Sequence, residues 1–411
     1  MLRFLVAGFL SVGVSLASAQ GADSAAIKKL AGESVQPALK TLDKLVSIES
    51  GSRDLEGLEK IRKLIESELT ERGLKPEVIA TPANEKTGSM VQATLKGRGT
   101  SKIALIAHMD TVYQKGDLAK QPFKVEGDRA YGLGIADDKA GIAMILHTIG
   151  MLQDLKIDTF GELTILINGD EEIGSPSSRD RITQLGEQND LVISFEGSSV
   201  KNDYVRLATS SIARADLTVR GRASHAGANP DFGRNALYEL SHQILQMRDL
   251  SNPETGLKLN WTIARAGTVR NMIPPEATAS ADARAEKMSD FDDLEKKLNQ
   301  RIQNKLIPDT VVKVELIRGR PSLNPTDKGR AVARQAQAIA EEIGWKMDVL
   351  EKPTGGGTDA AYAALRAKGA VIESFGLQGF GAHTDNAEYV LISSIQPRLY
   401  VTTRLIQSFK P

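Results

Sequence analysis

Residues 103–110 read IALIAHMD, and this stretch decides the fold. Five apolar residues in a row are typical of a strand that is buried on both faces of a mostly parallel sheet. The run ends at His108, and Asp110 follows two residues later. Because open α/β sheets bind ligands beyond the carboxyl ends of their strands, the stretch predicts an α/β fold with a functional site at His108.

Two later runs repeat this arrangement. Residues 163–167 (LTILI) lead to the acidic residues 170–172, and residues 191–195 (LVISF) lead to Glu196. Polar side chains after successive strands of one sheet are expected where such sheets place their sites. The pattern therefore indicates one shared site and not scattered surface charge.

The candidate metal ligands are two imidazoles and three carboxylates: His108, Asp137, Glu172, Glu196 and His383. Both ligand types suit zinc and similar divalent ions. Five ligands fit two ions with three ligands each if one carboxylate is shared. A metal pair leaves a position at which water can be activated, so the set predicts a hydrolase.

Composition limits the domain number and the kinds of partner and metal ligand that are possible. A chain of 411 residues exceeds the usual size of a single core, so two domains are expected. The 52 basic and 52 acidic residues cancel, so no overall field favours nucleic acid or an anionic membrane. The chain has no cysteine, which excludes disulfides and thiolate ligands.

Residues 1–19 have the features of a signal peptide. Arg3 gives a positive start, residues 4–17 are apolar, and residues 17–19 (ASA) form a cleavage site before Gln20. The alternative is a membrane anchor, but the apolar run is shorter than the roughly 20 residues that span a bilayer. We therefore expect a periplasmic or secreted protein that has no membrane segment after cleavage.

The pattern of the remaining chain predicts a catalytic domain with an insertion. Strand-like and helical runs alternate over residues 20–210 and again over residues 321–411. Residues 211–320 follow the order β-α-β-β-α-β, the ferredoxin-like unit. The expected fold is a mostly parallel α/β domain interrupted by a ferredoxin-like α+β domain.

Several blocks of sequence resemble the dizinc aminoacylase and carboxypeptidase family, and within it the bacterial glutamate carboxypeptidases. The resemblance covers essentially everything after the N-terminal segment. The matching blocks are residues 108–113 (HMDTVY), 131–139 (YGLGIADDK), 170–172 (DEE), 221–227 (GRASHAG), 260–263 (NWTI), 271–274 (NMIP) and 355–360 (GGGTDA). The resemblance implies a homodimer formed by the inserted domain.

The resemblance also implies a role for each candidate ligand. Asp137 would bridge two Zn²⁺ ions, with His108 and Glu196 completing one site and Glu172 and His383 completing the other. Metal chemistry also favours such a bridge, because two cations close together repel each other and a shared anion between them offsets that repulsion.

Two further carboxylates have candidate catalytic roles. Asp110 lies on the same face of an extended strand as His108, and its side chain is expected to accept the imidazole N–H; the alternative is a turn residue. Glu171 cannot easily ligate the same metal face as Glu172, and a free carboxylate there suits proton transfer. The family uses the first glutamate of the pair in this way; the alternative is an acidic loop in which either glutamate ligates.

His225 is the third candidate catalytic residue. By itself it reads as a capping or surface histidine in a glycine-rich turn. The resemblance implies that it reaches the active site of a neighbouring subunit and stabilises the oxyanion. His147 and His242 lie in helical patterns among apolar residues and are interpreted as structural.

The expected substrate-binding residues are Asn271, Arg284 and Gly356. The resemblance implies that Asn271 and Arg284 hold a substrate carboxylate, for which a guanidinium is well shaped. Gly356 lies in a glycine-rich loop whose backbone N–H groups suit an anion. Arg206 and Arg320 are further candidates for a side-chain carboxylate; the alternative for each is an ordinary surface charge.

The sequence thus predicts a zinc exopeptidase that removes a C-terminal amino acid, best matched by glutamate, from small N-acyl or folate-like substrates. The alternative is an N-acyl-amino-acid amidohydrolase or desuccinylase, which would share every ligand. A noncatalytic binding protein would be indicated by replacement of Glu171 or of two ligands, and neither replacement occurs.

Overall fold

The computed structural model describes residues 24–411 except residues 83 and 385–386. The predicted signal peptide, residues 1–19, lies outside the described residues. Over the part of the chain that is described, no helix combines the length and the hydropathy needed to cross a membrane.

The chain divides into two compact units, and the second is assembled from two separate segments. It contains Arg206–Thr326 and Leu350–Arg366, and the first unit contains the rest of the chain. The segment Leu350–Arg366 follows the predicted insert, residues 211–320, in sequence but groups with it in space. Sequence pattern cannot reveal such a grouping, because it depends on contacts between distant segments.

The first unit is built on a mixed six-stranded sheet, and four of its strands are parallel. The strands lie in the order β1-β2-β6-β3-β7-β15, with parallel pairing from β6 to β15 and antiparallel pairing of β1 and β2 at one edge. This confirms the predicted α/β fold. The strands are β1 (Glu77–Ile79), β2 (Gly88–Lys96), β3 (Lys102–His108), β6 (Glu162–Gly169), β7 (Leu191–Ser194) and β15 (Ala370–Ile372).

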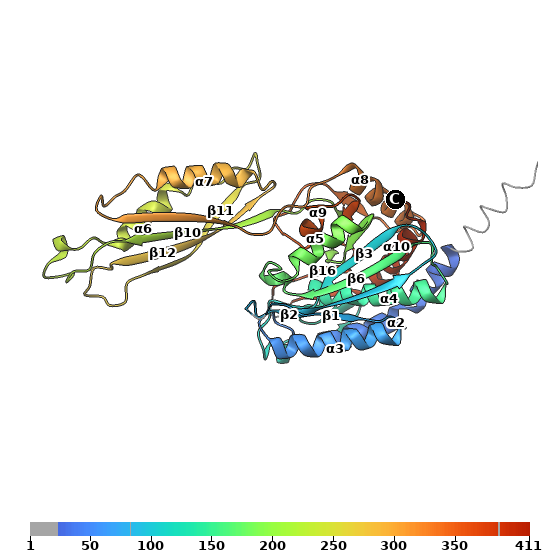
Figure 1. Cartoon of the computed structure of the whole chain (residues 1–411). Helices are drawn as coiled ribbons and strands as arrows, with labels where there is room; N and C mark the ends of the chain where they lie inside the picture. Colours follow the sequence, from blue (N-terminus) through green and yellow to red (C-terminus); the bar gives the residue numbers. More distant parts are fainter. Residues whose placement is uncertain (1–23, 83, 385–386) are drawn as a thin grey trace, which may run out of the picture. The chain divides into compact units, whose positions relative to one another are not determined.

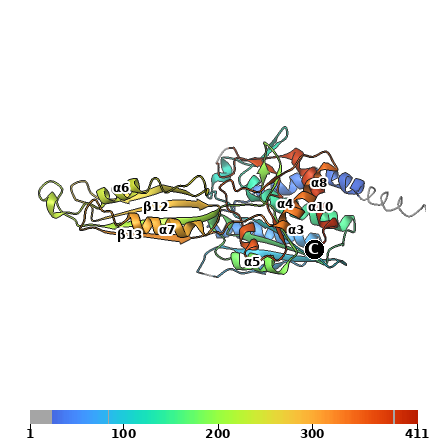
Figure 2. The ribbon, with the colours of Figure 1, turned by 90° about the horizontal axis from the view of Figure 1, so that it is seen from above.

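Helices cover both faces of this sheet (Figures 1 and 2). In β3 every residue after Lys102 is buried, as a strand covered on both faces requires. Helices α4 (Ala140–Asp154) and α5 (Arg179–Gln188) both contact β3. The other long helices of the unit are α2 (Val35–Val46), α3 (Leu55–Glu71), α8 (Asp327–Glu341) and α10 (Ile395–Ser408).

A second, small sheet in the first unit was not predicted, because its strands are only two or three residues long. Its order is β4-β5-β17-β16-β8. Strands β16 and β17 form a hairpin, and β17 pairs antiparallel with β5. The strands are β4 (Lys124–Glu126), β5 (Arg129–Tyr131), β8 (Ser198–Ser199), β16 (Gln378–Phe380) and β17 (Tyr389–Leu391). The pairing brings the hairpin loop, which contains His383, beside the chain that follows β5.

The second unit contains an antiparallel four-stranded sheet in the order β11-β12-β10-β13. With its two helices it has the predicted order β-α-β-β-α-β, so the ferredoxin-like unit is confirmed. Alternate residues of β12 are buried alanines, which pack into a core with Phe291 and Leu298. The elements are β10 (Ser211–Arg220), α6 (Ala236–Gln246), β11 (Lys258–Ala266), β12 (Glu276–Ala285), α7 (Asp290–Arg301) and β13 (Val311–Arg318). Further short elements include β9 (Tyr204–Arg206), which pairs with β14 (Asp348–Leu350), and α9 (Ala360–Ala364).

Candidate metal centre

Three neighbouring parallel strands of the large sheet bring candidate ligands together at their carboxyl ends. His108 is the last residue of β3, and Glu172 lies in the short turn η3 (Glu171–Ile173) after β6. Glu196 follows β7. Because β6, β3 and β7 are adjacent, their carboxyl ends deliver all three side chains to the same place.

Asp137 reaches this place from an irregular helical turn, η2 (Ile135–Lys139), immediately before α4. Gly134 begins the turn with φ 69°, and a Cβ there would approach the side chain of Thr111 to 2.4 Å. Only glycine fits this combination of left-handed backbone and close packing. The dihedral angles of Asp137 itself are not helical, so its carboxylate is free to point toward the sheet edge.

His383 comes from the loop between β16 and β17. Its φ is 64°, in the left-handed region, and its side chain is 54% exposed. A non-glycine residue with this backbone is uncommon and is found most often where function requires it. The hairpin therefore presents the imidazole at some conformational cost.

The five side chains form two groups that share Asp137. His108 Nε2 lies 3.0 Å from Asp137 Oδ1 and 3.5 Å from Glu196 Oε1. His383 Nε2 lies 3.1 Å from Asp137 Oδ2 and 3.3 Å from Glu172 Oε2. Each oxygen of Asp137 thus faces a different histidine, which is the geometry of a bridging carboxylate.

The donor set fits divalent metal ions. Ligand atoms about 2.0–2.1 Å from a tetrahedral zinc ion lie roughly 3.3 Å from one another, close to the separations found here. Glu172 Oε1 is buried and has no hydrogen-bond partner, although a buried carboxylate oxygen without a partner is costly. Burial raises the pKa of Glu172 to about 7 although His383 lies 3.3 Å away, and a metal ion at these ligands would stabilise the ionised carboxylate further.

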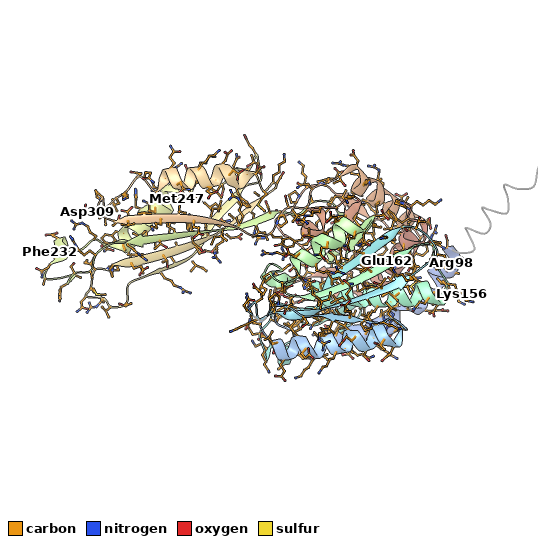
Figure 3. All side chains as sticks on the ribbon, in the orientation of Figure 1. Arg98, Lys156, Glu162, Phe232, Met247 and Asp309 are labelled. Carbon is orange, nitrogen blue, oxygen red and sulfur yellow. The ribbon has the colours of Figure 1, made fainter. Side chains whose placement is uncertain are left out.

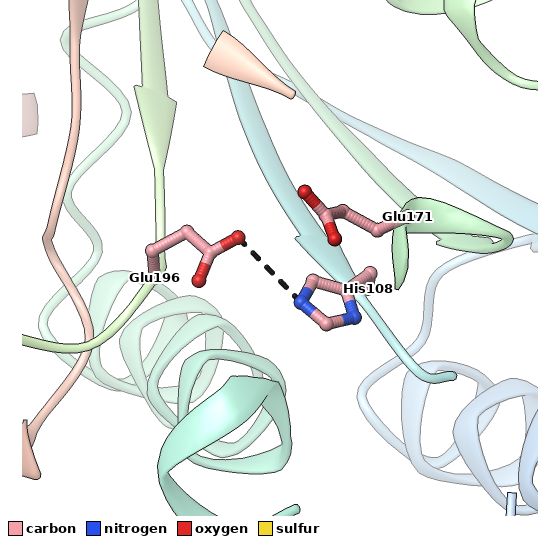
Figure 4. Close-up of side chains that lie close together, drawn as sticks. All are labelled: His108, Glu171 and Glu196. Atoms are coloured by element: carbon pink, nitrogen blue, oxygen red, sulfur yellow. Dashed lines mark ion pairs between the residues drawn. The ribbon is translucent and has the colours of Figure 1, made fainter. Parts of the chain in front are cut away.

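Glu171 also lies within ligand distance of this site. One oxygen of Glu171, one oxygen of Glu196 and one nitrogen of His108 all lie within 4.8 Å of one another. Figure 4 shows the two carboxylates beside the imidazole, with the ion pair between His108 and Glu196 marked. His108 therefore has three carboxylates around it, and we favour Asp137 over Glu171 as its ligand partner because Asp137 also contacts His383.

Asp110 is buried beside His108, and its side chain has a further task in addition to the predicted contact with the imidazole. The backbone carbonyl of Asp110 lies 3.0 Å from His108 Nδ1, whereas the nearest carboxylate oxygen lies 3.4 Å away. The carboxylate accepts the backbone N–H groups of Glu171 (3.0 Å) and Glu172 (3.1 Å), and the hydroxyl of Ser52 (2.8 Å). Asp110 thus positions the two glutamates, because their N–H groups point at its oxygens.

His225 and Asn271 lie together in the second unit. The residue after His225, Ala226, donates its N–H to the carbonyl of Asn271 (2.9 Å). His225 Nδ1 accepts the N–H groups of Gly227 (3.2 Å) and Ala228 (3.0 Å). An accepting Nδ1 requires the ring proton to be on Nε2, so the exposed imidazole offers an N–H donor there. Figure 3 labels Phe232 and Asp309, which lie at this end of the unit.

Arg284 and Gly356 form a separate group with other cations. Arg284 Nη1 donates to the carbonyl of Gly355 (3.3 Å), and Arg206 Nη1 donates to Thr354 Oγ1 (2.6 Å). Lys258 pairs opposite Arg284 in the sheet, and its Nζ lies 3.9 Å from the position of a Cβ on Gly355. Three cationic side chains therefore surround one glycine-rich loop.

The alternative that Arg320 is an ordinary surface charge is wrong. Arg320 is buried, donates to the carbonyl of Gly357 (3.1 Å) and lies over the ring of Tyr362, so it is neither a surface charge nor free for a substrate. The carbonyl of Gly356 accepts a hydrogen bond from the N–H of Ser210 (2.8 Å), and this bond fixes the position of the loop. Arg284 is also paired with Asp282 at 2.9 Å.

The two groups of the second unit lie at opposite ends of its sheet. The turn with His225 and Asn271 adjoins the beginning of β12 at Glu276, whereas Arg284 lies eight residues further along the same strand. Eight residues of a strand span about 26 Å. One small substrate cannot contact both groups of the same chain.

The other two histidines have structural environments. His147 Nε2 lies 2.9 Å from Thr41 Oγ1, and His242 Nε2 lies 3.1 Å from the carbonyl of Asn304. Neither belongs to the ligand groups found among the described residues.

Imidazoles and carboxylates that meet at the carboxyl ends of parallel strands in this way are typical of an α/β metallohydrolase. The chain belongs to the peptidase family M20/M25/M40, whose model matches residues 104–408. It is similar to carboxypeptidase G2 of Pseudomonas sp. (strain RS-16), with 47% identity over 90% of this chain and 89% of that protein. It is also similar to succinyl-diaminopimelate desuccinylase of Gluconobacter oxydans, with 26% identity over 70% of this chain and 76% of that protein.

Solved structures share the same fold. A tripeptidase from Staphylococcus aureus subsp. aureus Mu50 matches with a TM-score of 0.76 and 20% identity, covering 91% of this chain and 98% of that one. The protein is therefore a hydrolase of a metallopeptidase family, as the sequence predicted.

Proposed function

We propose that this protein is a dizinc carboxypeptidase that hydrolyses the amide bond to a C-terminal glutamate in N-acyl or folate-like substrates. The proposal rests on the similarity to carboxypeptidase G2 and on one observation above all. Arg206, Lys258 and Arg284 surround a single loop, and a cluster of three cations fits a substrate end that carries two carboxylates.

The proposed ligand assignment follows the two groups around Asp137. His108 and Glu196 would hold one ion, Glu172 and His383 the other, and Asp137 would bridge them. When bound, two divalent ions supply Lewis acidity that polarises a carbonyl and acidifies water near neutral pH.

The chain's own residues would carry the proton and orient the substrate. Glu171 would take a proton from the attacking water and deliver it to the leaving nitrogen, as a general base and then a general acid. Asp110 holds the backbone of Glu171, so the carboxylate is preorganised for this transfer. The Nε2–H of His225 would donate to the developing oxyanion.

The separation of His225 from Arg284 supports a homodimer in which subunits complete each other's sites. Because the two residues lie about 26 Å apart along the sheet, they cannot serve one substrate within a single chain. A second copy of the chain would supply His225 and Asn271 to the site whose Arg284 binds the substrate carboxylate.

A substrate panel tests the specificity. We expect N-acyl-glutamates to be cleaved with kcat/KM well above that for N-acyl-aspartates and aliphatic N-acyl amino acids. Arg206→Gln should raise KM for the acyl-glutamate by about tenfold or more, since a charge-assisted hydrogen bond is lost, and should leave acyl-leucine cleavage unchanged. Arg98→Gln, which changes an exposed arginine paired with Asp158 (2.6 Å) in the first unit, is the control.

The alternative function is that of an amidohydrolase that removes acyl groups from amino acids in general, or that of a desuccinylase. The similarity to succinyl-diaminopimelate desuccinylase supports this alternative. It shares every proposed ligand. The same panel separates the two, because the alternative predicts that Arg206→Gln affects all substrates equally or that succinylated amines are preferred.

A further inference from the structure

Glu388 is a buried carboxylate beside the metal centre that belongs to neither ligand group. Its exposed fraction is 0%. Its Oε2 accepts from the hydroxyl of Tyr113 (2.5 Å) and the N–H of Gly134 (2.8 Å). Its Oε1 accepts from the N–H groups of Ala136 (2.8 Å) and Asp137 (3.2 Å). Four donors therefore converge on one carboxylate.

Three of these donors belong to the turn that carries the bridging carboxylate. The turn begins at Gly134 with a left-handed backbone and is not helical at Asp137, so its N–H groups lack helical partners there. Glu388 satisfies three of them at once. Because one side chain accepts all three N–H groups, Glu388 fixes the backbone from which Asp137 projects.

The same carboxylate connects to the loop of His383. The hydroxyl of Tyr113 lies 2.8 Å from the carbonyl of Thr384, the residue after His383, and shares its one proton between that carbonyl and Glu388. The carbonyl of Glu388 accepts from Gln121 Nε2 (2.8 Å) and from the N–H of Gly132 (3.3 Å). Glu388 thus joins the two loops that carry Asp137 and His383.

The two acceptor oxygens of Glu388 suit this position. Three of the groups that face them are backbone N–H donors, and the fourth is the hydroxyl of Tyr113. A glutamine of the same shape has one acceptor oxygen, so its NH₂ group would face either Gly134 or both Ala136 and Asp137 and would leave at least one backbone N–H without an acceptor. A buried donor without a partner is costly, so the exchange would let the turn move.

We propose that Glu388 is a positioning residue that sets the spacing between Asp137 and His383 and so tunes the affinity for the ion held by Asp137, Glu172 and His383. The inference rests on the metal centre of the proposed function. It adds that a residue outside the ligand set controls how well one ion of the pair is held.

The test compares Glu388→Gln and Glu388→Asp with the wild type. Zinc affinity is measured by competition with a chromophoric chelator, the Co²⁺-loaded proteins are compared by visible absorption, and kcat and KM are determined separately. We expect Glu388→Gln to weaken one of the two zinc affinities by about 10–100-fold, the usual effect of removing a group that orients a ligand. The Co²⁺ spectrum should change, kcat should fall with little change in KM, and Glu388→Asp should recover part of the loss.

Glu68→Gln is the matched control. Glu68 is also a buried glutamate of the first unit, but it pairs with Lys44 (2.8 Å) and Arg72 (2.8 Å) and not with the ligand loops. We expect this variant to lose thermal stability and to keep both zinc affinities and the Co²⁺ spectrum.

The outcomes separate this inference from the proposed function. A folded Glu388→Gln with wild-type affinities and spectrum would overturn the positioning role and leave the proposed function intact. A wild type that binds no zinc would instead refute the metal centre. If Glu388→Gln does not fold, Tyr113→Phe removes only one donor and should weaken the same ion several-fold; wild-type affinity in that variant would also overturn the inference.

Discussion

Asp137 points one oxygen at His108 and the other at His383, at 3.0 and 3.1 Å. Glu196 is paired with His108, and Glu172 is paired with His383. The position of Asp137 places the charge of one side chain where it can offset two cations, so both ions of the proposed pair would depend on Asp137.

The first prediction follows from this shared position. Asp137→Ala should lose both metal ions, because each group then retains only two of its three ligands. His383→Ala should mainly weaken one ion. Metal analysis of dialysed proteins checks this, and two zinc ions retained by Asp137→Ala would contradict the bridging role.

The second prediction concerns Glu171, which lies close enough to His108 to ligate as well as to act as a base. If it is the base, Glu171→Gln should keep its metal content and lose roughly 10²–10⁴-fold in kcat. Atomic absorption and steady-state kinetics on the same preparation give both values. Loss of an ion from Glu171→Gln would show that Glu171 ligates, the alternative that the sequence left open.

At the scale of elements, the packing of α4 on α2 places His147 against Thr41. Burial, aided by the charge of Arg72, lowers the pKa of His147 to about 4. The unfolded chain therefore binds a proton at this residue below about pH 6.5, whereas the folded chain does not until about pH 4. Stability from this contact is present above pH 6.5 and is lost as the pH falls toward 4.

The third prediction measures this loss. Urea unfolding of the wild type and of His147→Gln, both with chelator present, should show the wild type losing up to about 2 kcal/mol more than the variant between pH 8 and pH 5. The chelator removes the contribution of metal binding from both proteins. Parallel losses in the two proteins would mean that His147 is not held neutral by the fold.

At the scale of the whole molecule, the proposed homodimer would complete each active site with a residue of the second chain. Mixing His225→Ala with Glu171→Gln, each inactive alone, should restore activity, because a mixed dimer contains one site with both residues intact. Exchange of subunits is shown first by pull-down of a tagged chain. Exchange without recovery of activity would show that His225 acts in its own chain or not at all.

The N-terminus supports a last proposal at this scale. We propose that the chain is exported and cleaved after Ala19, as the ASA site at residues 17–19 predicts. Mass spectrometry of protein recovered from the periplasm or medium of an expressing bacterium should find Gln20 as the first residue. An intact chain found only in the cytosol would refute export.

The sequence by itself determined the fold class and the candidate ligand set. Apolar runs such as residues 103–107 predict buried strands from local pattern alone, and the rule that parallel sheets bind at their carboxyl ends then locates His108, Glu172 and Glu196. The order β-α-β-β-α-β of the second unit was likewise visible, because each of its elements has its own hydrophobic period.

Only the tertiary structure decided how these parts meet. It showed the two oxygens of Asp137 facing different histidines, the carboxylate of Asp110 holding the backbone of Glu171, and the four donors around Glu388. It also separated His225 from Arg284 along one strand. These features depend on where backbone N–H groups and distant loops point, and the identity of a residue does not encode the direction of groups that lie far away along the chain.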